Sequence, residues 1–166
     1  MTAPSSSATP PVLLVAYGTG PMSDAQLHLA CRSANDIGGV VRVLHVIERS
    51  RHIPLSTPLA PQEQVRLDAL LDRAEHIVHQ YAVPYHLEGH QAPSVGAAIV
   101  EAAMEHHPLA IFIGLRDRPR PGITLLLSAT VRHILRHAPC PVQIGYLPAS
   151  LPDDVARDLS YPMSDQ

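Results

Sequence analysis

Apolar residues follow two alternating patterns along the chain. Short, mostly apolar runs, typical of buried strands, occupy residues 12–17, 40–47, 84–88, 109–113 and 142–146. Between them, apolar residues recur every three or four positions, as on one face of a helix, in residues 23–37, 62–82, 94–107 and 129–137. The alternation predicts βαβ units with right-handed crossovers. The expected fold class is therefore α/β, a single doubly wound five-stranded parallel sheet with helices on both faces.

Local signals set the boundaries of these elements. Ser23 is a candidate N-cap for the first helix, and Gly38 and Gly39 follow its end. Residues 49–61 contain three prolines and are predicted to form a loop, and residues 89–93 are predicted to lead out of the third strand. The inward stripe of the first helix is expected to contain Leu27, Ala30, Cys31, Ala34 and Ile37, and that of the second Leu67, Leu70, Leu71, Ala74, Ile77, Val78 and Tyr81.

The composition restricts the class of protein. Apolar residues make up 46% of the chain and charged residues 16%, with one Phe and no Trp, so an aliphatic core is expected. All 12 basic side chains are arginines, which excludes a catalytic or phosphate-binding lysine. A net charge of −3 gives no reason to expect a nucleic-acid partner. No apolar run is long enough for membrane insertion, and we expect a cytoplasmic protein.

The cysteines and histidines do not form a recognisable catalytic or metal motif. Cys31 and Cys140 are far apart in sequence and are expected to be free thiols in a reducing compartment. His76 and His79 can share one helix face, but no third ligand is spaced to join them, so no metal site is expected. His45, on an apolar strand, is expected to be a hydrogen-bonded core residue. No nucleophile and base are paired by sequence, so we expect no enzyme.

The alternation of five strands with helices and three short segments together resemble the universal stress protein family. The segments are Leu44-His45-Val46, the run from Ala98 to Ala102, and the run from Arg136 to Pro141. The resemblance covers residues 12–147, between a predicted disordered arm at 1–11 and an acidic tail at 148–166. It implies the strand order 3-2-1-4-5 and a homodimer formed through the last strand, from Val142 to Tyr146. That strand would be an apolar sheet edge, which pairing would cover.

The resemblance implies two sequence features for family members that bind ATP. These members carry an Asp after the first strand, and after the fourth strand they carry a glycine-rich loop that ends in Gly-Ser or Gly-Thr. Gly18 stands at the Asp position here, and Gly114 matches the first glycine. Asp117 replaces the second glycine, and the final glycine is missing, although Ser128 and Thr130 offer hydroxyl groups near that point. We therefore expect no ATP site of the family type.

The expected function is a non-catalytic stress-response or regulatory domain. The alternative is an adenine-nucleotide-binding protein or weak nucleotide hydrolase, with ATP or AMP as ligand. Its candidate site combines the Val46 backbone at the adenine with Gly18, Gly114, Arg116, Ser128 and Thr130 around the phosphates. Arg116 belongs to a loop with three arginines, which could supply the charge that the glycines no longer provide.

Residues 18–20 (Gly-Thr-Gly) form either a small anion-binding turn or a simple strand-to-helix turn. A second alternative is a docking subunit of a larger complex, using residues 49–61 or the tail.

Overall fold

Strands and helices alternate along the whole described part of the chain, residues 9–115 and 127–146 of the computed structural model. The strands are Val12–Ala16 (β1), Val40–Glu48 (β2), Tyr85–Ala92 (β3), Ala110–Gly114 (β4) and Val142–Gly145 (β5). The helices are Pro21–Ile37 (α1), Pro61–Val78 (α2), Val95–His106 (α3) and Ala129–His137 (α4). The predicted α/β class is confirmed. The predicted arm at residues 1–8 and the tail after Tyr146 lie outside the described residues.

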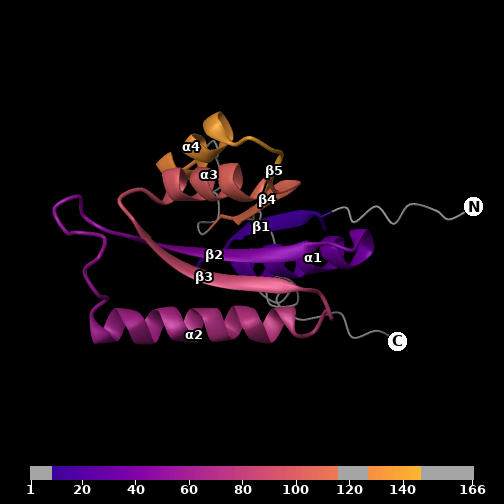
Figure 1. The fold of residues 1–166 in the computed structure, drawn as a ribbon, viewed down its shortest axis with the longest axis horizontal. Helices are drawn as coiled ribbons and strands as arrows, with labels where there is room; N and C mark the ends of the chain where they lie inside the picture. The colour runs from indigo at the N-terminus through magenta and orange to yellow at the C-terminus, as the bar shows by residue number, and fades with distance from the viewer. Residues whose placement is uncertain (1–8, 116–126, 147–166) are drawn as a thin grey trace, which may run out of the picture.

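The sheet is entirely parallel and has the order β3-β2-β1-β4-β5. The predicted order is therefore confirmed, with β1 in the centre and β3 and β5 at the edges. Figure 1 shows the layers: α1 and α2 pack on one face, and α3 and α4 on the other. Strand β2 lies on one side of β1 in the sheet, and β4 lies on the other side. The strand order therefore reverses between β1 and β4, and their carboxyl ends form the topological switch point.

Strands β2 and β3 continue beyond the end of β1. The β1–β2 pairing ends where Ala16 meets Leu44, whereas the β2–β3 pairing runs on to Glu48 and Ala92. Residues 45–48 and 89–92 thus form a two-stranded extension, which we call the overhanging ribbon. The prediction that the third strand ends at Glu88 is wrong. Gly89 stays in the strand and allows α2 to approach, because an added Cβ would lie 2.8 Å from the Leu67 side chain.

Each face of the sheet has its own aliphatic core. Under α1 and α2, the core includes Val15, Leu27, Cys31, Val43 and Val78. Under α3 and α4, it includes Leu14, Leu44, Ile99, Ile111 and Ile134. Both cysteines are free, as predicted.

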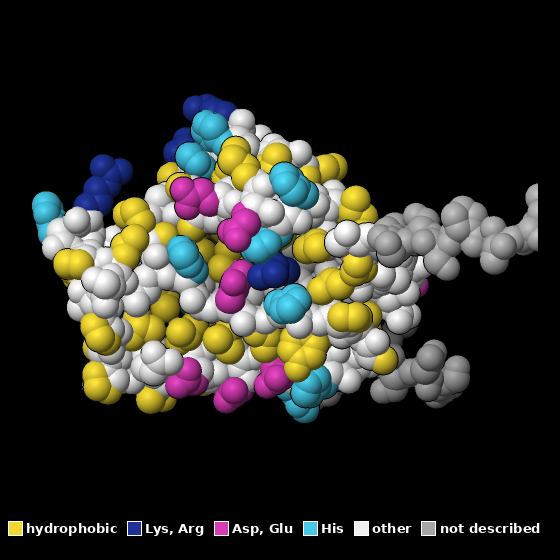
Figure 2. All heavy atoms as spheres, in the orientation of Figure 1, with side chains coloured by type: hydrophobic (Ala, Val, Ile, Leu, Met, Phe, Trp, Pro, Cys, Tyr) yellow, Lys and Arg dark blue, Asp and Glu magenta, His cyan; other side chains and the backbone are white. Residues whose placement is uncertain are grey.

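Helices α3 and α4 leave the outer part of their sheet face uncovered, and polar side chains occupy it. Arg42 on β2 forms an ion pair of 3.3 Å with Glu88 on β3. Figure 2 shows acidic, basic and histidine side chains gathered over this region, above a band of hydrophobic side chains between β3 and α2. Parallel sheets are usually covered on both faces. The polar side chains explain why this part of the face can remain exposed to solvent here.

Two helix boundaries and one buried position differ from the prediction. Helix α1 begins at Pro21 after Gly20, so Ser23 is not its N-cap. Ile37, expected in the buried stripe, is 46% exposed because the left-handed Gly38 ends the helix there. Helix α2 ends at Val78 instead of Ala82. The remaining stripe of α1, from Leu27 to Ala34, is fully buried as predicted.

Candidate functional site

A cleft of about 580 Å³ lies at the carboxyl ends of β1, β2 and β4 and is bounded by α3 and α4. Five of the six predicted site residues line it: Gly18, Val46, Gly114, Ser128 and Thr130. Arg116, the sixth, lies outside the described residues. Residues that are widely separated in sequence thus meet at the topological switch point, the position where open α/β sheets bind ligands.

The start of α4 contributes two hydroxyl groups to the cleft. Ser128 is the N-cap of α4, because its Oγ accepts the Val131 N–H at 3.2 Å. Its hydroxyl proton remains available for a ligand. Thr130 is held close to α3, since a Cβ added to Gly96 would lie 3.1 Å from the Thr130 carbonyl oxygen. The amino end of α4 therefore presents hydroxyl groups and the positive end of a helix dipole to the cleft.

Val46 presents its main chain to the cleft. The Leu44 carbonyl accepts the Tyr17 N–H at 2.9 Å, which is the last such bond between β2 and the chain that leaves β1. Because main-chain groups two residues apart point to the same side of a strand, the Val46 N–H and C=O face the side that β1 has left. A donor and an acceptor on one residue can recognise the edge of a planar heterocycle.

Packing requires the glycine at position 114. A Cβ at Gly114 would lie 2.6 Å from the Met22 carbonyl carbon and 2.7 Å from the Ser23 nitrogen, both in the first turn of α1. The close approach of α1 to the end of β4 thus explains this residue, whatever the cleft binds.

The Gly18 N–H is already used within the protein. It donates to Ser23 Oγ at 3.2 Å, which is the role that Ser23 has instead of capping α1. Gly20 has a φ of 106°, a backbone conformation that favours glycine, and its carbonyl accepts the Ser23 N–H at 3.1 Å. The turn after β1 is therefore stabilised by internal hydrogen bonds, as the simpler of the two interpretations of residues 18–20 predicts.

His45 forms part of the cleft wall. Its Nδ1–H donates to the Tyr17 carbonyl at 2.8 Å, so the predicted hydrogen bond exists. The side chain is only half-buried, however, and lines the cleft, so the expectation of a core residue is wrong. It remains accessible because β1 ends beside it, at the pairing of Ala16 with Leu44.

A cluster of polar groups around the buried Asp24 fixes the end of β1 to both helices of one layer. The Tyr17 hydroxyl donates to Asp24 Oδ1 at 2.5 Å. Arg73 donates from Nε to the same oxygen at 3.2 Å and from Nη2 to Oδ2. Burial, followed by the hydrogen bond to Asp24, raises the pKa of Tyr17 well above its usual value. Sequence reasoning missed this cluster, because Arg73 is far from Asp24 along the chain and no motif connects them.

Neither thiol has the environment typical of a reactive cysteine. Burial raises the pKa of Cys31 to about 12 and also raises the pKa of Cys140. Reactive cysteines have lowered pKa values, so both belong to the structural kind. Across residues 9–115 and 127–146, no group of three His, Cys, Asp or Glu side chains is placed to hold a metal ion.

The chemistry of the described lining is that of a binding site. Apolar walls from β2, α3 and β4 face a polar end formed by the start of α4 and the turn after β1. Such a combination, with few convergent polar groups, fits a flat apolar ring that carries a polar substituent.

Comparisons with known proteins agree with this fold. A sequence profile of the universal stress protein family matches residues 11–144. The chain therefore belongs to the universal stress protein family. No curated protein sequence matches it significantly. None of the described helices has the length and hydrophobicity needed to span a membrane.

Solved structures of low sequence identity share the fold. A universal stress protein from Archaeoglobus fulgidus has a TM-score of 0.65 at 19% identity and covers 81% of this chain and 92% of its own. The universal stress protein from the same organism in complex with dAMP has a TM-score of 0.63 at 18% identity, over 81% and 96%. A family protein from Arabidopsis thaliana with AMP bound has a TM-score of 0.60 at 17% identity, over 89% and 99%.

Proposed function

We propose that this chain is a cytoplasmic, non-catalytic stress-response domain regulated by an adenine nucleotide monophosphate in the switch-point cleft. The observation that carries the proposal is the meeting of Gly18, Val46, Gly114, Ser128 and Thr130 in one cleft. Two of the structurally similar proteins contain dAMP and AMP, which supports the choice of ligand class.

The adenine would lie against the apolar wall. Val95 and Ile99 of α3 and Ile113 of β4 provide apolar surface on either side. The free main-chain groups of Val46 provide an acceptor for the exocyclic amine and a donor for a ring nitrogen. These two bonds would distinguish adenine from guanine, because guanine carries a carbonyl where adenine carries the amine.

The phosphate would lie at the amino end of α4. Main-chain N–H groups there carry partial positive charge, and the Ser128 and Thr130 hydroxyls can both donate. Among the described lining residues, Glu48 is the only one with a formal charge at neutral pH. A single phosphate therefore fits this lining better than a triphosphate. Asp117 at a glycine position of the ATP motif favours the same choice.

Isothermal titration with AMP, cyclic AMP and magnesium ATP tests the proposal. We expect micromolar binding of AMP and weaker binding of ATP. Thr130→Val should weaken AMP binding by roughly fivefold to tenfold, as for loss of one hydrogen bond. Arg132→Ala is the matched control, because Arg132 is an exposed residue on the same helix that does not line the cleft. Absence of AMP binding at millimolar concentration would overturn the proposal.

The alternative, a nucleotide-binding protein with weak hydrolase activity, gives a different outcome in the same experiment. ATP would bind at least as tightly as AMP, and incubation with magnesium would release phosphate above a buffer control. Arg116→Ala tests the remaining predicted contact, and loss of ATP binding in that variant alone would support this alternative.

The loop between β2 and α2 supports a second candidate function, docking to a protein partner. Ile53 and Leu55 are exposed there, 39% and 49%, although both are large apolar side chains. Figure 1 shows the loop extending away from the body of the domain. Recovery of a single defined partner with the wild type but not with Ile53→Ser/Leu55→Ser would support this function.

A further inference from the structure

A second cavity lies on the opposite face of the overhanging ribbon from the cleft. It has a volume of about 530 Å³ and opens between the ribbon and the amino-terminal half of α2. We call it the α2 cavity. Its lining includes Ile47, Glu63, Arg66, Leu67, Ala69 and Leu70.

The cavity exists because α2 is longer than the core beneath it. Ala74, Ile77 and Val78 in the second half of the helix are buried against the sheet. In the first half, Leu67 packs against Gly89 of the ribbon and Leu70 against the margin of the core, and both stay half-buried. Two leucines on the inward side of a helix thus remain partly exposed, together with Ile47, and form an apolar floor.

Around this floor, the acidic side chains have arginine partners, but not every arginine has an acidic partner of its own. Asp24 receives both hydrogen bonds from Arg73. Glu63 is held by Arg49 through two bonds of 3.2 and 3.0 Å and by the Ala60 N–H at 3.0 Å. Arg66 has no ion-pair partner among the described residues.

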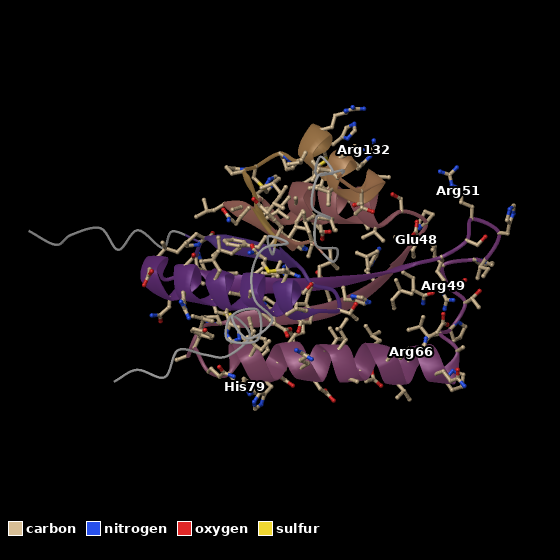
Figure 3. The ribbon with its side chains drawn as sticks, turned by 180° about the vertical axis from the view of Figure 1, so that it is seen from behind. Glu48, Arg49, Arg51, Arg66, His79 and Arg132 are labelled. Carbon is tan, nitrogen blue, oxygen red and sulfur yellow. The ribbon has the colours of Figure 1, made fainter. Side chains whose placement is uncertain are left out.

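A net positive charge therefore remains at the rim of the cavity, because Arg49 and Arg66 share Glu63. Figure 3 shows Arg66 on α2 and Arg49 at the end of β2, at the same end of the molecule. Glu63 is the one acid among the described lining residues. The hydrogen bond from the Ala60 N–H lowers the pKa of Glu63 most, and Arg49, which binds the carboxylate, and the charge of Arg66 lower it further. Two arginines therefore face one acid, so the rim attracts an anion and the floor attracts apolar surface.

We propose that the α2 cavity is a second ligand site, which binds a small amphipathic carboxylate such as a medium-chain acyl anion. The acyl chain would lie on Ile47, Leu67 and Leu70, and the carboxylate would pair with Arg66. The volume falls in the range of about 300–1,000 Å³ usual for small-molecule sites. A nucleotide fits this cavity poorly, because it carries more charge than the net positive charge at the rim balances and less apolar surface than the floor offers.

Calorimetry with octanoate, 1-octanol and acetate tests the proposal on the full chain. We expect octanoate to bind with submillimolar affinity, octanol more weakly and acetate not at all, because both the charge and the chain contribute. Arg66→Ala should weaken octanoate binding by about twofold to fivefold, the effect of an exposed ion pair. The same variant should leave octanol binding unchanged.

Two further variants keep the test specific. Ala69 is exposed on α2, so Ala69→Glu should fold normally while placing a negative charge at the rim, and it should abolish octanoate binding. Arg132→Ala, on α4, is the charge-matched control and should bind octanoate like the wild type. No octanoate binding at millimolar concentration, or equal binding by wild type and Arg66→Ala, would overturn the proposal. AMP titration of Arg66→Ala separates the two sites, because the cleft should be unaffected.

Discussion

Arg73 on α2 donates hydrogen bonds to both carboxylate oxygens of Asp24 on α1 and thereby links the two helices of one layer. Asp24 is only 3% exposed, whereas the Arg73 side chain is 60% exposed, so a solvent-facing arginine neutralises a buried acid. Removing the arginine would leave the carboxylate with the Tyr17 hydroxyl as its remaining side-chain donor among the described residues.

Arg73→Ala should therefore lower the free energy of unfolding by about 1–3 kcal/mol, the cost of an under-satisfied buried polar group. Urea denaturation measures the change. Arg66→Ala on the same helix is the control and should change stability by less than about 0.5 kcal/mol. Adding Asp24→Asn to Arg73→Ala should recover part of the loss. Equal stability of Arg73→Ala and Arg66→Ala would show that the ion pair contributes nothing.

Acid should weaken the fold through His28. Burial lowers the pKa of His28 below its ordinary value of 6.5, with Asp24 opposing and Arg32 assisting. The unfolded chain takes up this proton near pH 6.5 and the folded chain does so only at lower pH. The contribution to stability is thus present above pH 6.5 and lost as the pH falls toward the folded-state pKa.

His28→Gln should give a smaller loss of stability between pH 7 and pH 5 than the wild type, measured by urea denaturation at each pH. His79→Gln is the matched control, because the His79 side chain is 62% exposed. If His28→Gln and wild type lost stability in parallel, His28 would not be a determinant of acid sensitivity.

The contact between Gly114 and α1 gives a steric prediction. Gly114→Ala places a Cβ against the main chain of Met22, which cannot move without shifting α1. We expect a loss of about 1–3 kcal/mol in the free energy of unfolding. Gly89→Ala should cost less, because its Cβ would meet only the end of the flexible Leu67 side chain. The opposite ranking in urea denaturation would contradict this account of Gly114.

The edge strand β5 gives a prediction about assembly. If the protein is a homodimer through β5, Gln143→Lys should place like charges across the interface and yield a monomer by light scattering. Gln143 is exposed, so the variant should fold normally. Ile144→Lys is a less clean test, because Ile144 packs partly against the core under α3 and α4. A Gln143→Lys variant with an unchanged dimer mass would place the interface elsewhere.

Hydrophobic periodicity was sufficient for the order and type of the elements, because each strand and helix carries its own local pattern. It failed where a boundary depends on a distant partner. Residues 89–92 look like a turn, with Gly, His and Gln, yet they remain in β3 because β2 continues beside them. Tyr146 was assigned to the last strand, but β5 ends at Gly145.

The candidate site was predictable to a similar extent. Parallel strands bring their carboxyl ends to one edge, so Gly18, Val46 and Gly114 had to lie near one another once the strand order was known. The roles of individual residues were not predictable. The hydrogen bond from the Gly18 N–H to Ser23, and the cluster of Tyr17, Asp24 and Arg73, depend on the angle at which α1 and α2 cross the sheet.

The overhanging ribbon is a shared wall, because His45 and Ile47 line both the cleft and the α2 cavity. A ligand on either side that orders this wall removes part of the entropic cost of binding on the other side. The coupling free energy must then be the same in both directions, so a carboxylate that tightens nucleotide binding is itself bound more tightly when the nucleotide is present. The fraction of the protein that carries nucleotide would then depend on the concentrations of both the nucleotide and the carboxylate.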